Sequence, residues 1–142
     1  MDLPKKSLGQ YWLVDEDVLP LIQIETNRAF FDYQAKYKDD QTVYRFDFEA
    51  TPEVIDKITR SALDACVALE TKGLVRVDVM LDKFHRPWVL EVNTVPGLTD
   101  HSLVPKAAER AGLTLGELCE HTLRSCLDTV RDRRQRWQNT TN

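Results

Sequence analysis

Residues 74–81 carry the clearest pattern in the chain, an alternation that separates two kinds of side chain. The odd-numbered positions are apolar: Val75, Val77, Val79 and Leu81. The even-numbered positions after Leu74 carry Arg76, Asp78 and Met80. Because successive side chains of a strand point to opposite faces, this run predicts a β-strand with one apolar face and a polar pair on the other.

A second run of this kind, residues 88–93, follows after a short polar segment. Parity places three apolar side chains on one face: Trp88, Leu90 and Val92. The other face then carries Val89, Glu91 and Asn93. Residues 82–87 between the two runs predict a hairpin turn, in which His85 is expected to be exposed and not a metal ligand.

The register of this hairpin decides which polar side chains meet. A pairing of Leu81 with Trp88 sets the polar residues of the two runs opposite one another: Asp78 with Glu91, and Arg76 with Asn93. Opposed carboxylates repel, unless a hard cation lies between them. Asp, Glu and Asn oxygens are ligands that Mg²⁺ or Mn²⁺ accepts together with phosphate oxygens, and an arginine beside them suits phosphate. The pattern therefore favours a metal–phosphate site, with a solvated polar face as the alternative for any single residue.

A helix is predicted before the hairpin. Thr51 is a suitable N-cap and Pro52 a suitable first helical residue, and the helix is expected to run to about Glu70 and to end before Gly73. Its apolar side chains recur at helical spacing: Ile55, Ile58, Ala62, Cys66 and Leu69.

Two more helices are predicted after the hairpin. Ser102 is the expected N-cap of a short helix that ends at about Arg110. Thr114 and Glu117 have the spacing of a capping box, and the helix that they begin is expected to reach the Arg-rich region 131–136. An arginine-rich end is favourable near a helix C-terminus, so a solvated tail is the simplest interpretation of it.

The remaining segments predict short strands and loops. Residues 11–14 and 19–24 are expected to be strands. Residues 25–40 interleave aromatic and charged side chains, which is typical of a surface loop. The two ends, 1–10 and 138–142, are expected to be frayed or disordered.

Composition narrows the class of protein. The chain has 142 residues, 42% hydrophobic and 30% charged, which suits one globular domain with a core of its own. The net charge of −4 gives no reason to expect a nucleic-acid partner. No apolar run is long enough to span a bilayer, and no signal peptide pattern is present. The odd set of Cys66, Cys119 and Cys126 contains no CxxC pair, which favours a reducing compartment and small core residues.

Two stretches carry a resemblance to a known family. One, beginning at Asp78, has the sequence DVMLDKFHRPWVLEVNTVPGLTDHSLVPKAAERAGL, and the other, beginning at Ile22, has the sequence IQIETNRAFFDYQAKY. The first strongly resembles the C-terminal segment of D-alanine–D-alanine ligases, which are ATP-grasp enzymes. The second is similar to the segment that leads into the mobile lid of the same family. The resemblance runs from about Leu19 to Leu118, and it implies an α+β fold for residues 1–142, the C-terminal ATP-grasp subdomain, with a mostly antiparallel sheet and helices packed on it.

The resemblance also implies a reaction. ATP phosphorylates the carboxylate of one D-alanine to an acyl phosphate, and the amine of a second D-alanine displaces the phosphate, which gives D-alanyl-D-alanine, ADP and phosphate. This reaction supplies a peptidoglycan precursor in the cytoplasm. Catalysis of this kind is mostly positioning and charge neutralisation, and two Mg²⁺ or Mn²⁺ ions are expected to accompany ATP.

By the same resemblance, the ATP–metal site falls on residues of the hairpin and of the lid. Asp78, Glu91 and Asn93 match the metal ligands, and Glu91 matches the position that bridges both ions and so contacts the cofactor. Arg76 and Lys36 match residues that stabilise charge on the transferring phosphoryl group and on the intermediate, and Lys36 is also expected to bind the cofactor.

A second group of residues matches the site of the amino-acid substrate. The amide at Gly97 is implied to form part of an oxyanion hole. Ser102 and the amide of Leu103 are implied to bind the carboxylate of the second D-alanine. Tyr37 is implied to hold the closed lid, and the segment 34–50 is expected to be mobile in this chain.

The main departure from the family is length. A whole ligase has additional N-terminal parts that supply the first D-alanine site, a glycine-rich phosphate loop and the adenine pocket, whereas the five glycines here form no such loop. The chain is therefore expected to be a C-terminal portion that is inactive without its N-terminal partner, and a homodimer of the full-length enzyme stays open. The alternatives are another ATP-grasp carboxylate–amine ligase, a non-catalytic nucleotide- or metal-binding module, and a purely structural domain.

Overall fold

The computed structural model describes residues 8–14, 17–25, 43–47, 50–99 and 102–140 of the chain. In this part of the chain, six strands form one sheet: β1 Leu8–Val14, β2 Asp17–Val18, β3 Ile22–Glu25, β4 Val43–Arg45, β5 Leu74–Leu81 and β6 Pro87–Asn93. The described helices are α2 Pro52–Ala68, α3 Leu103–Arg110 and α4 Leu115–Thr140.

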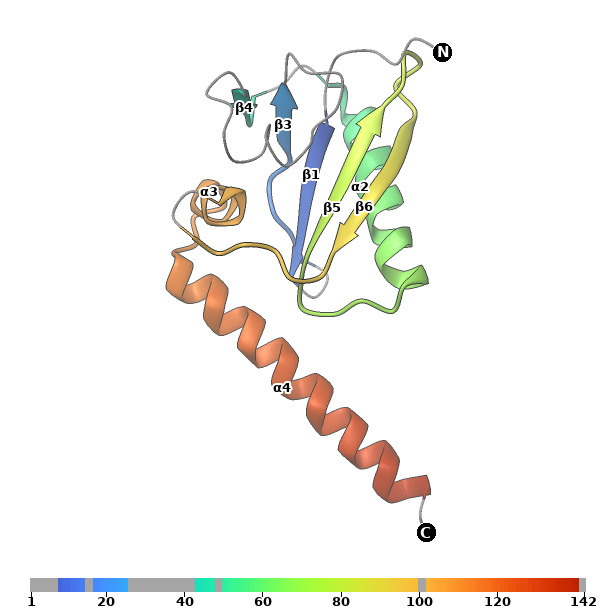
Figure 1. Cartoon of the computed structure of the whole chain (residues 1–142), viewed down its shortest axis with the longest axis vertical. Coiled ribbons are helices and arrows are strands. Elements are labelled where there is room, and N and C mark those ends of the chain that lie inside the picture. The colour runs from blue at the N-terminus through green and yellow to red at the C-terminus, as the bar shows by residue number, and fades with distance from the viewer. Residues whose placement is uncertain (1–7, 15–16, 26–42, 48–49, 100–101, 141–142) are drawn as a thin grey trace.

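The sheet is antiparallel at each strand pair that the structure describes. Its strands follow the order β4-β3-β1-β5-β6, and the short β2 pairs with β1. Figure 1 shows α2 behind the sheet, α3 to the left of β1 and below β4, and α4 running away from the body. The predicted α+β fold, a mostly antiparallel sheet with helices packed on it, is confirmed.

One face of the sheet is covered by α2. Pro52 begins this helix after the N-cap Thr51, as predicted. A hydrophobic cluster joins the helix to the odd-numbered side chains of β5: Ile58, Ala62, Cys66, Val75, Val77 and Val79. The two ends of the predicted apolar stripe are not buried. Ile55 is 38% exposed, and Leu69, which lies beyond the last helical residue, is 61% exposed.

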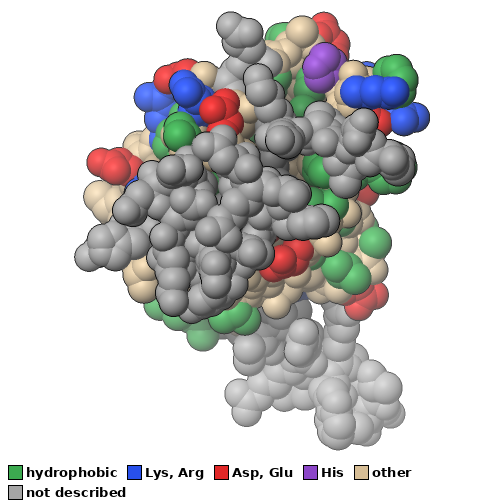
Figure 2. Space-filling view, turned by 45° about the horizontal axis from the view of Figure 1, so that its top comes forward, with side chains coloured by type: hydrophobic (Ala, Val, Ile, Leu, Met, Phe, Trp, Pro, Cys, Tyr) green, Lys and Arg blue, Asp and Glu red, His purple; other side chains and the backbone are tan. Residues whose placement is uncertain are grey.

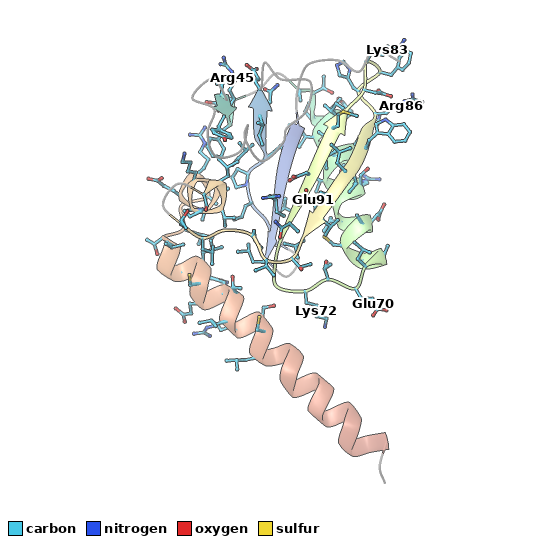
Figure 3. The ribbon with its side chains drawn as sticks, in the orientation of Figure 1. Arg45, Glu70, Lys72, Lys83, Arg86 and Glu91 are labelled. Atoms are coloured by element: carbon cyan, nitrogen blue, oxygen red, sulfur yellow. The ribbon has the colours of Figure 1, made fainter. Side chains whose placement is uncertain are left out.

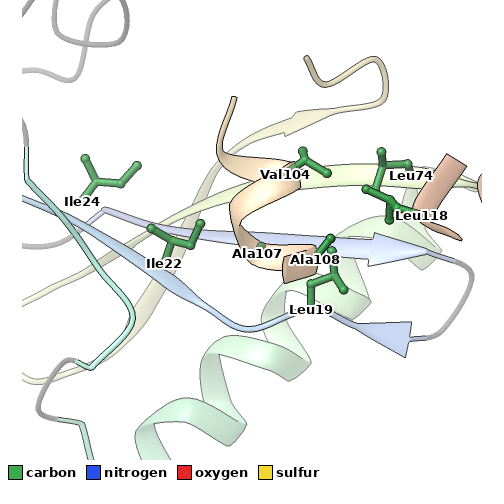
Figure 4. Close-up of a cluster of buried hydrophobic side chains, with 8 residues drawn as sticks. All are labelled: Leu19, Ile22, Ile24, Leu74, Val104, Ala107, Ala108 and Leu118. Atoms are coloured by element: carbon green, nitrogen blue, oxygen red, sulfur yellow. The ribbon is translucent and has the colours of Figure 1, made fainter. Parts of the chain in front are cut away.

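The opposite face carries a second hydrophobic cluster beneath α3 and the first turn of α4 (Figure 4). Its buried members come from both helices, from β5, and from β3 with the residues before it: Leu19, Ile22, Ile24, Leu74, Val104, Ala107, Ala108 and Leu118. Leu74 and Val75 are neighbours in β5 and belong to different clusters, so the alternation predicted for this strand is confirmed. Arg76 and Asp78 therefore share the face on which α3 packs.

Several element boundaries differ from the sequence prediction. β1 begins at Leu8, inside the segment expected to be frayed, because residues 8–10 pair with both β3 and β5. Residues 43–45, inside the segment expected to be mobile, form β4 against β3. Helix α4 continues to Thr140, so the prediction of disorder from 138 onward is wrong for residues 138–140.

The capping box that begins α4 is confirmed in atomic detail. The Thr114 amide and hydroxyl both donate to the Glu117 carboxylate at 2.8 Å, and the Glu117 amide donates to Thr114 Oγ1 at 3.2 Å. The bonds from Thr114 lower the pKa of the Glu117 carboxyl below its usual value, and the bond from the Thr114 amide has the largest effect. The first buried residue of the helix is Leu118, which anchors α4 to the core.

The β5–β6 hairpin has two registers, one on each side of a β-bulge. Near the turn, Leu81 pairs with Pro87 and Val79 with Val89, whereas Asp78 pairs with Glu91, so Leu90 is the extra residue. The predicted pairing of Leu81 with Trp88 is therefore wrong by one residue. Directly opposed residues share a face, so the bulge also reverses the predicted faces of Trp88 and Val89.

The hairpin turn is organised by the carboxylate of Asp82. It accepts hydrogen bonds from the amides of Phe84 at 2.8 Å and Arg86 at 3.0 Å, from Arg86 Nε at 2.7 Å and from Trp88 Nε1 at 3.4 Å. Burial alone would raise the pKa of this carboxyl, but these bonds outweigh burial and hold the pKa well below its usual value. His85 is exposed, as predicted, and has a positive φ of 56°.

Charged and apolar side chains are mixed on the surface. On the face shown in Figure 2, basic side chains gather at separate places with acidic and apolar side chains beside them.

The cysteines differ in burial. Cys66 is buried, as predicted, whereas Cys126 is exposed and is not a core residue. None of the helices in the described residues combines the length and apolar character needed to cross a lipid bilayer.

Candidate functional site

Arg76 joins the two carboxylates of the hairpin. Its Nε lies 2.9 Å from Asp78 Oδ1 on the same strand, and its Nη2 donates to Glu91 Oε1 at 3.1 Å across the strand pair. The side chains of Arg76 and Asp78 are only 10% and 7% exposed, whereas that of Glu91 is 50% exposed. Figure 3 labels Glu91 near the middle of the sheet. Arg76 and Asp78 are therefore almost fully buried, whereas the Glu91 carboxylate is open to solvent.

The position of this group follows from the hairpin register. The predicted opposition of Asp78 with Glu91 and of Arg76 with Asn93 is confirmed. Both carboxylates contact one guanidinium, so they lie on the same face of the sheet. Because two negative charges placed opposite each other would weaken the ladder, the guanidinium between them removes a repulsion that the register creates.

The donor set suits a hard cation. Asp78 and Glu91 supply carboxylate oxygens, and Asn93 Oδ1, which accepts the amide of Val95 at 2.9 Å, keeps a second lone pair for a cation. No three His, Cys, Asp or Glu side chains of the described segments gather into a metal-binding group, so an amide oxygen would have to complete this set. In the structure, both carboxylates contact the positive charge of Arg76.

A second polar group lies at the start of α3. Ser102 is the N-cap, as predicted, but its side chain makes no capping bond to the helix. Its Oγ accepts the Thr99 amide at 3.1 Å and lies 2.8 Å from Thr99 Oγ1, while the Ser102 amide donates to the Thr99 carbonyl at 2.8 Å. Leu103, the first helical residue, packs against the core cluster beneath α3.

Gly97 lies close to the same hydroxyl. A Cβ added to Gly97 would come within 2.8 Å of Ser102 Oγ, which is closer than side chains tolerate. The loop 94–99 joins the end of β6 to this region, so the two polar groups follow one another along the chain (Figure 1). The resemblance assigned Asp78, Glu91 and Asn93 to the metal site, and Gly97 and Ser102 to the substrate site; in the structure the described loop 94–99, which contains Gly97, follows directly after Asn93, the last residue of β6.

Two of the predicted site residues, Lys36 and Tyr37, lie outside the described residues. Two further features were not predicted from the sequence: the contacts of Thr99 with Ser102, and the bulge at Leu90, which sets the face of Glu91. The signal for Thr99 was its position three residues before a predicted N-cap. The signal for the bulge was the unbroken apolar run 87–90, in which alternation cannot fix the faces of the strand.

Comparison with known proteins identifies relatives for most of the chain. The family model for the D-ala D-ala ligase C-terminus matches residues 13–124. A D-alanine–D-alanine ligase from Marinobacter nauticus is 45% identical over 115 residues, which are 81% of this chain and 35% of that protein. A ligase of the same name from Ectopseudomonas mendocina is 47% identical over 102 residues, which are 72% of this chain and 33% of that protein.

Solved structures give the same result for the fold. The D-alanine–D-alanine ligase of Bacillus anthracis, in a crystal structure complexed with ATP, superposes with a TM-score of 0.76 at 28% identity and covers 91% of this chain and 40% of that one. The chain thus spans about a third of the length of the curated relatives named above.

Proposed function

The chain belongs to the D-alanine–D-alanine ligase C-terminus family of ATP-grasp enzymes, and from this membership we propose that it forms the C-terminal catalytic part of an ATP-dependent D-alanine–D-alanine ligase. The observation that carries the proposal is the contact of Arg76 with both Asp78 and Glu91 on one face of the sheet. This arrangement brings together hard oxygen donors and a guanidinium, and these are the groups that suit a cation and a phosphate.

The proposed reaction joins two D-alanine molecules. The carboxylate of the first takes the terminal phosphoryl group of ATP and becomes an acyl phosphate. The amine of the second attacks the acyl carbon, phosphate leaves, and the products are D-alanyl-D-alanine, ADP and phosphate. In a cell this would supply a precursor of peptidoglycan, in the cytoplasm.

The hairpin is proposed to hold the charged end of the nucleotide. Asp78, Glu91 and Asn93 would hold two Mg²⁺ or Mn²⁺ ions, with Glu91 contacting both. Bound there, the ions would neutralise negative charge on the phosphates of ATP. Arg76, whose side chain is 10% exposed and lies 2.9 Å from Asp78, would bring the positive charge of its guanidinium to phosphoryl oxygens.

The region at the start of α3 is proposed to hold the acceptor. The hydroxyl of Ser102 and the amide of Leu103 would bind the carboxylate of the second D-alanine, and the amide of Gly97 would stabilise negative charge on the tetrahedral intermediate. Lys36 is proposed to bind the transferring phosphoryl group, and Tyr37 to hold a closed lid.

We expect the 142 residues to need the remainder of a ligase for activity. The relatives are about three times as long as the part that this chain matches. The first D-alanine site, the phosphate loop and the adenine pocket are proposed to come from that remainder, and a homodimer is one state that the complete enzyme could adopt.

The test is a hybrid enzyme. The segment of the Marinobacter nauticus ligase that matches this chain is replaced by the corresponding residues of the chain, and ADP and dipeptide formation are measured with D-alanine, D-lactate and L-amino acids. We expect D-alanyl-D-alanine from the hybrid and none from the 142-residue chain alone. The Asp78→Asn hybrid serves as the inactive control. Product from a different acid–amine pair, but not from D-alanine, would favour another ATP-grasp ligase instead.

A further inference from the structure

Thr99 makes three contacts with the residue proposed to bind the acceptor carboxylate. Its amide donates to Ser102 Oγ at 3.1 Å, its hydroxyl lies 2.8 Å from the same atom, and its carbonyl accepts the Ser102 amide at 2.8 Å. Two of these contacts converge on Ser102 Oγ. The surroundings of the Ser102 hydroxyl are therefore set mainly by Thr99.

We propose that Thr99 is a positioning residue that turns the Ser102 hydroxyl into a hydrogen-bond donor for the acceptor carboxylate; the inference rests on the proposed function of Ser102. A serine hydroxyl has two lone pairs and one proton. When the Thr99 amide and the Thr99 hydroxyl both donate to Ser102 Oγ, they occupy both lone pairs. The proton of Ser102 is then directed away from Thr99 and is available to an anion.

The opposite orientation would not serve a carboxylate. If Ser102 donated its proton to Thr99 Oγ1, the free position on Ser102 Oγ would be a lone pair, which repels a carboxylate oxygen. A donor to the ionised group, in contrast, makes a charge-assisted hydrogen bond. The side chain is also free of the usual N-cap role, because it makes no bond to the amides of α3.

Gly97 leaves space beside the hydroxyl. A Cβ at position 97 would lie 2.8 Å from Ser102 Oγ, so a side chain there would displace the hydroxyl. Gly97 and Thr99 are both exposed. A ligand can therefore reach the group without a rearrangement of the core.

The first test measures steady-state kinetics of the hybrid enzyme with Thr99→Val, which removes the hydroxyl and keeps the side-chain shape and the amide. We expect the KM of the acceptor D-alanine to rise about fivefold or more, the usual effect of one lost hydrogen bond. We expect kcat to change by less than about twofold, because the carboxylate contact is made equally in the ground state and the transition state.

Two further variants separate positioning from general damage. Thr99→Ser keeps the hydroxyl and is expected to restore the KM, whereas Thr94→Val, an exposed threonine of the same loop, is expected to leave the KM unchanged. An unchanged KM in Thr99→Val, a loss confined to kcat, or a failure of Thr99→Ser to restore binding would each overturn the inference.

A second measurement does not depend on catalysis. In the NMR spectrum of the 142-residue chain, Ser102→Ala is expected to move the Thr99 amide proton upfield and to increase its temperature dependence, because its acceptor is lost. An unaffected Thr99 amide contradicts the inference whatever the kinetics. A hybrid that makes no dipeptide, combined with an affected Thr99 amide, refutes the proposed function and with it the role of Thr99 in substrate binding, and leaves only the local hydrogen bond standing.

Discussion

Asp78 on β5 lies directly opposite Glu91 on β6, although the residue pairs between them and the turn are displaced by one position. The bulge at Leu90 absorbs the displacement, and it sets the Glu91 carboxylate on the face that carries Arg76 and Asp78. The hairpin thus brings together three charged side chains, of which two are almost fully buried. The energetic consequences of this arrangement can be measured.

Loss of Arg76 is expected to destabilise the fold strongly. Arg76→Met keeps most of the volume of the side chain but breaks the buried ion pair with Asp78, which typically costs about 3–5 kcal/mol of unfolding free energy. Urea denaturation measures the loss. Arg124→Met, which breaks an exposed pair with Glu120 on α4, is the control and should cost less than about 1 kcal/mol. The double variant Arg76→Met/Asp78→Asn should recover part of the loss, and equal costs for the two single variants would refute the interpretation.

The candidate metal site predicts a localised paramagnetic effect. In an NMR titration of the chain with Mn²⁺, with and without ATP, we expect line broadening centred on Asp78, Glu91 and Asn93, because these residues provide the hard oxygen donors. The Asp78→Asn variant should weaken the effect at all three positions. Broadening distributed evenly over the acidic side chains of the surface would speak against a metal site on this hairpin.

The turn carboxylate of Asp82 predicts a pH-dependent contribution to stability. Its pKa is lower in the folded chain than the value of about 3.9 expected in the unfolded chain. The stabilisation is therefore fully present above about pH 5 and decreases as the pH falls below about 4 toward the folded pKa. Thermal midpoints of the chain and of Asp82→Asn should differ at pH 7 and converge in acid. A difference that stays constant down to pH 3 would show that the carboxylate is not the origin of the effect.

Helix α4 is predicted to depend on the buried contact of Leu118 in its first turn. Leu118 is fully buried, and Leu118→Ala should cost about 3 kcal/mol or more, because it leaves a cavity between α4 and the core beneath α3. Leu123→Ala in the same helix is the matched control: this side chain is 63% exposed and should change stability by less than about 0.5 kcal/mol. Chemical denaturation of both variants measures the difference, and similar values would mean that α4 is held elsewhere.

The local features of the fold were determined by the sequence itself. The alternation in β5 assigned Arg76 and Asp78 to one face and Val75 and Val77 to the other, because polar and apolar residues alternate there without interruption. The Thr51–Pro52 start of α2 and the capping box of α4 were equally evident. In the capping box the bonding partners, Thr114 and Glu117, lie three residues apart, so the sequence contains the whole interaction. In β5 and at the start of α2, the order of residue types is the signal, although the side chains of β5 pack on a distant helix.

Other features were decided only by tertiary contacts. The faces of β6 near the turn depend on the bulge at Leu90, since an apolar run such as 87–90 fits either face and only pairing with β5 selects one. Residues 8–10 became a strand because β3 and β5 offered partners on both sides. The Ser102 side chain contacts Thr99 and makes no hydrogen bond to its own helix, although either contact is compatible with an N-cap serine. The sequence thus determined which residues could form the site, and the pairing of distant segments decided how they face one another, because a backbone or hydroxyl group with several available partners bonds to the one that the fold brings nearest.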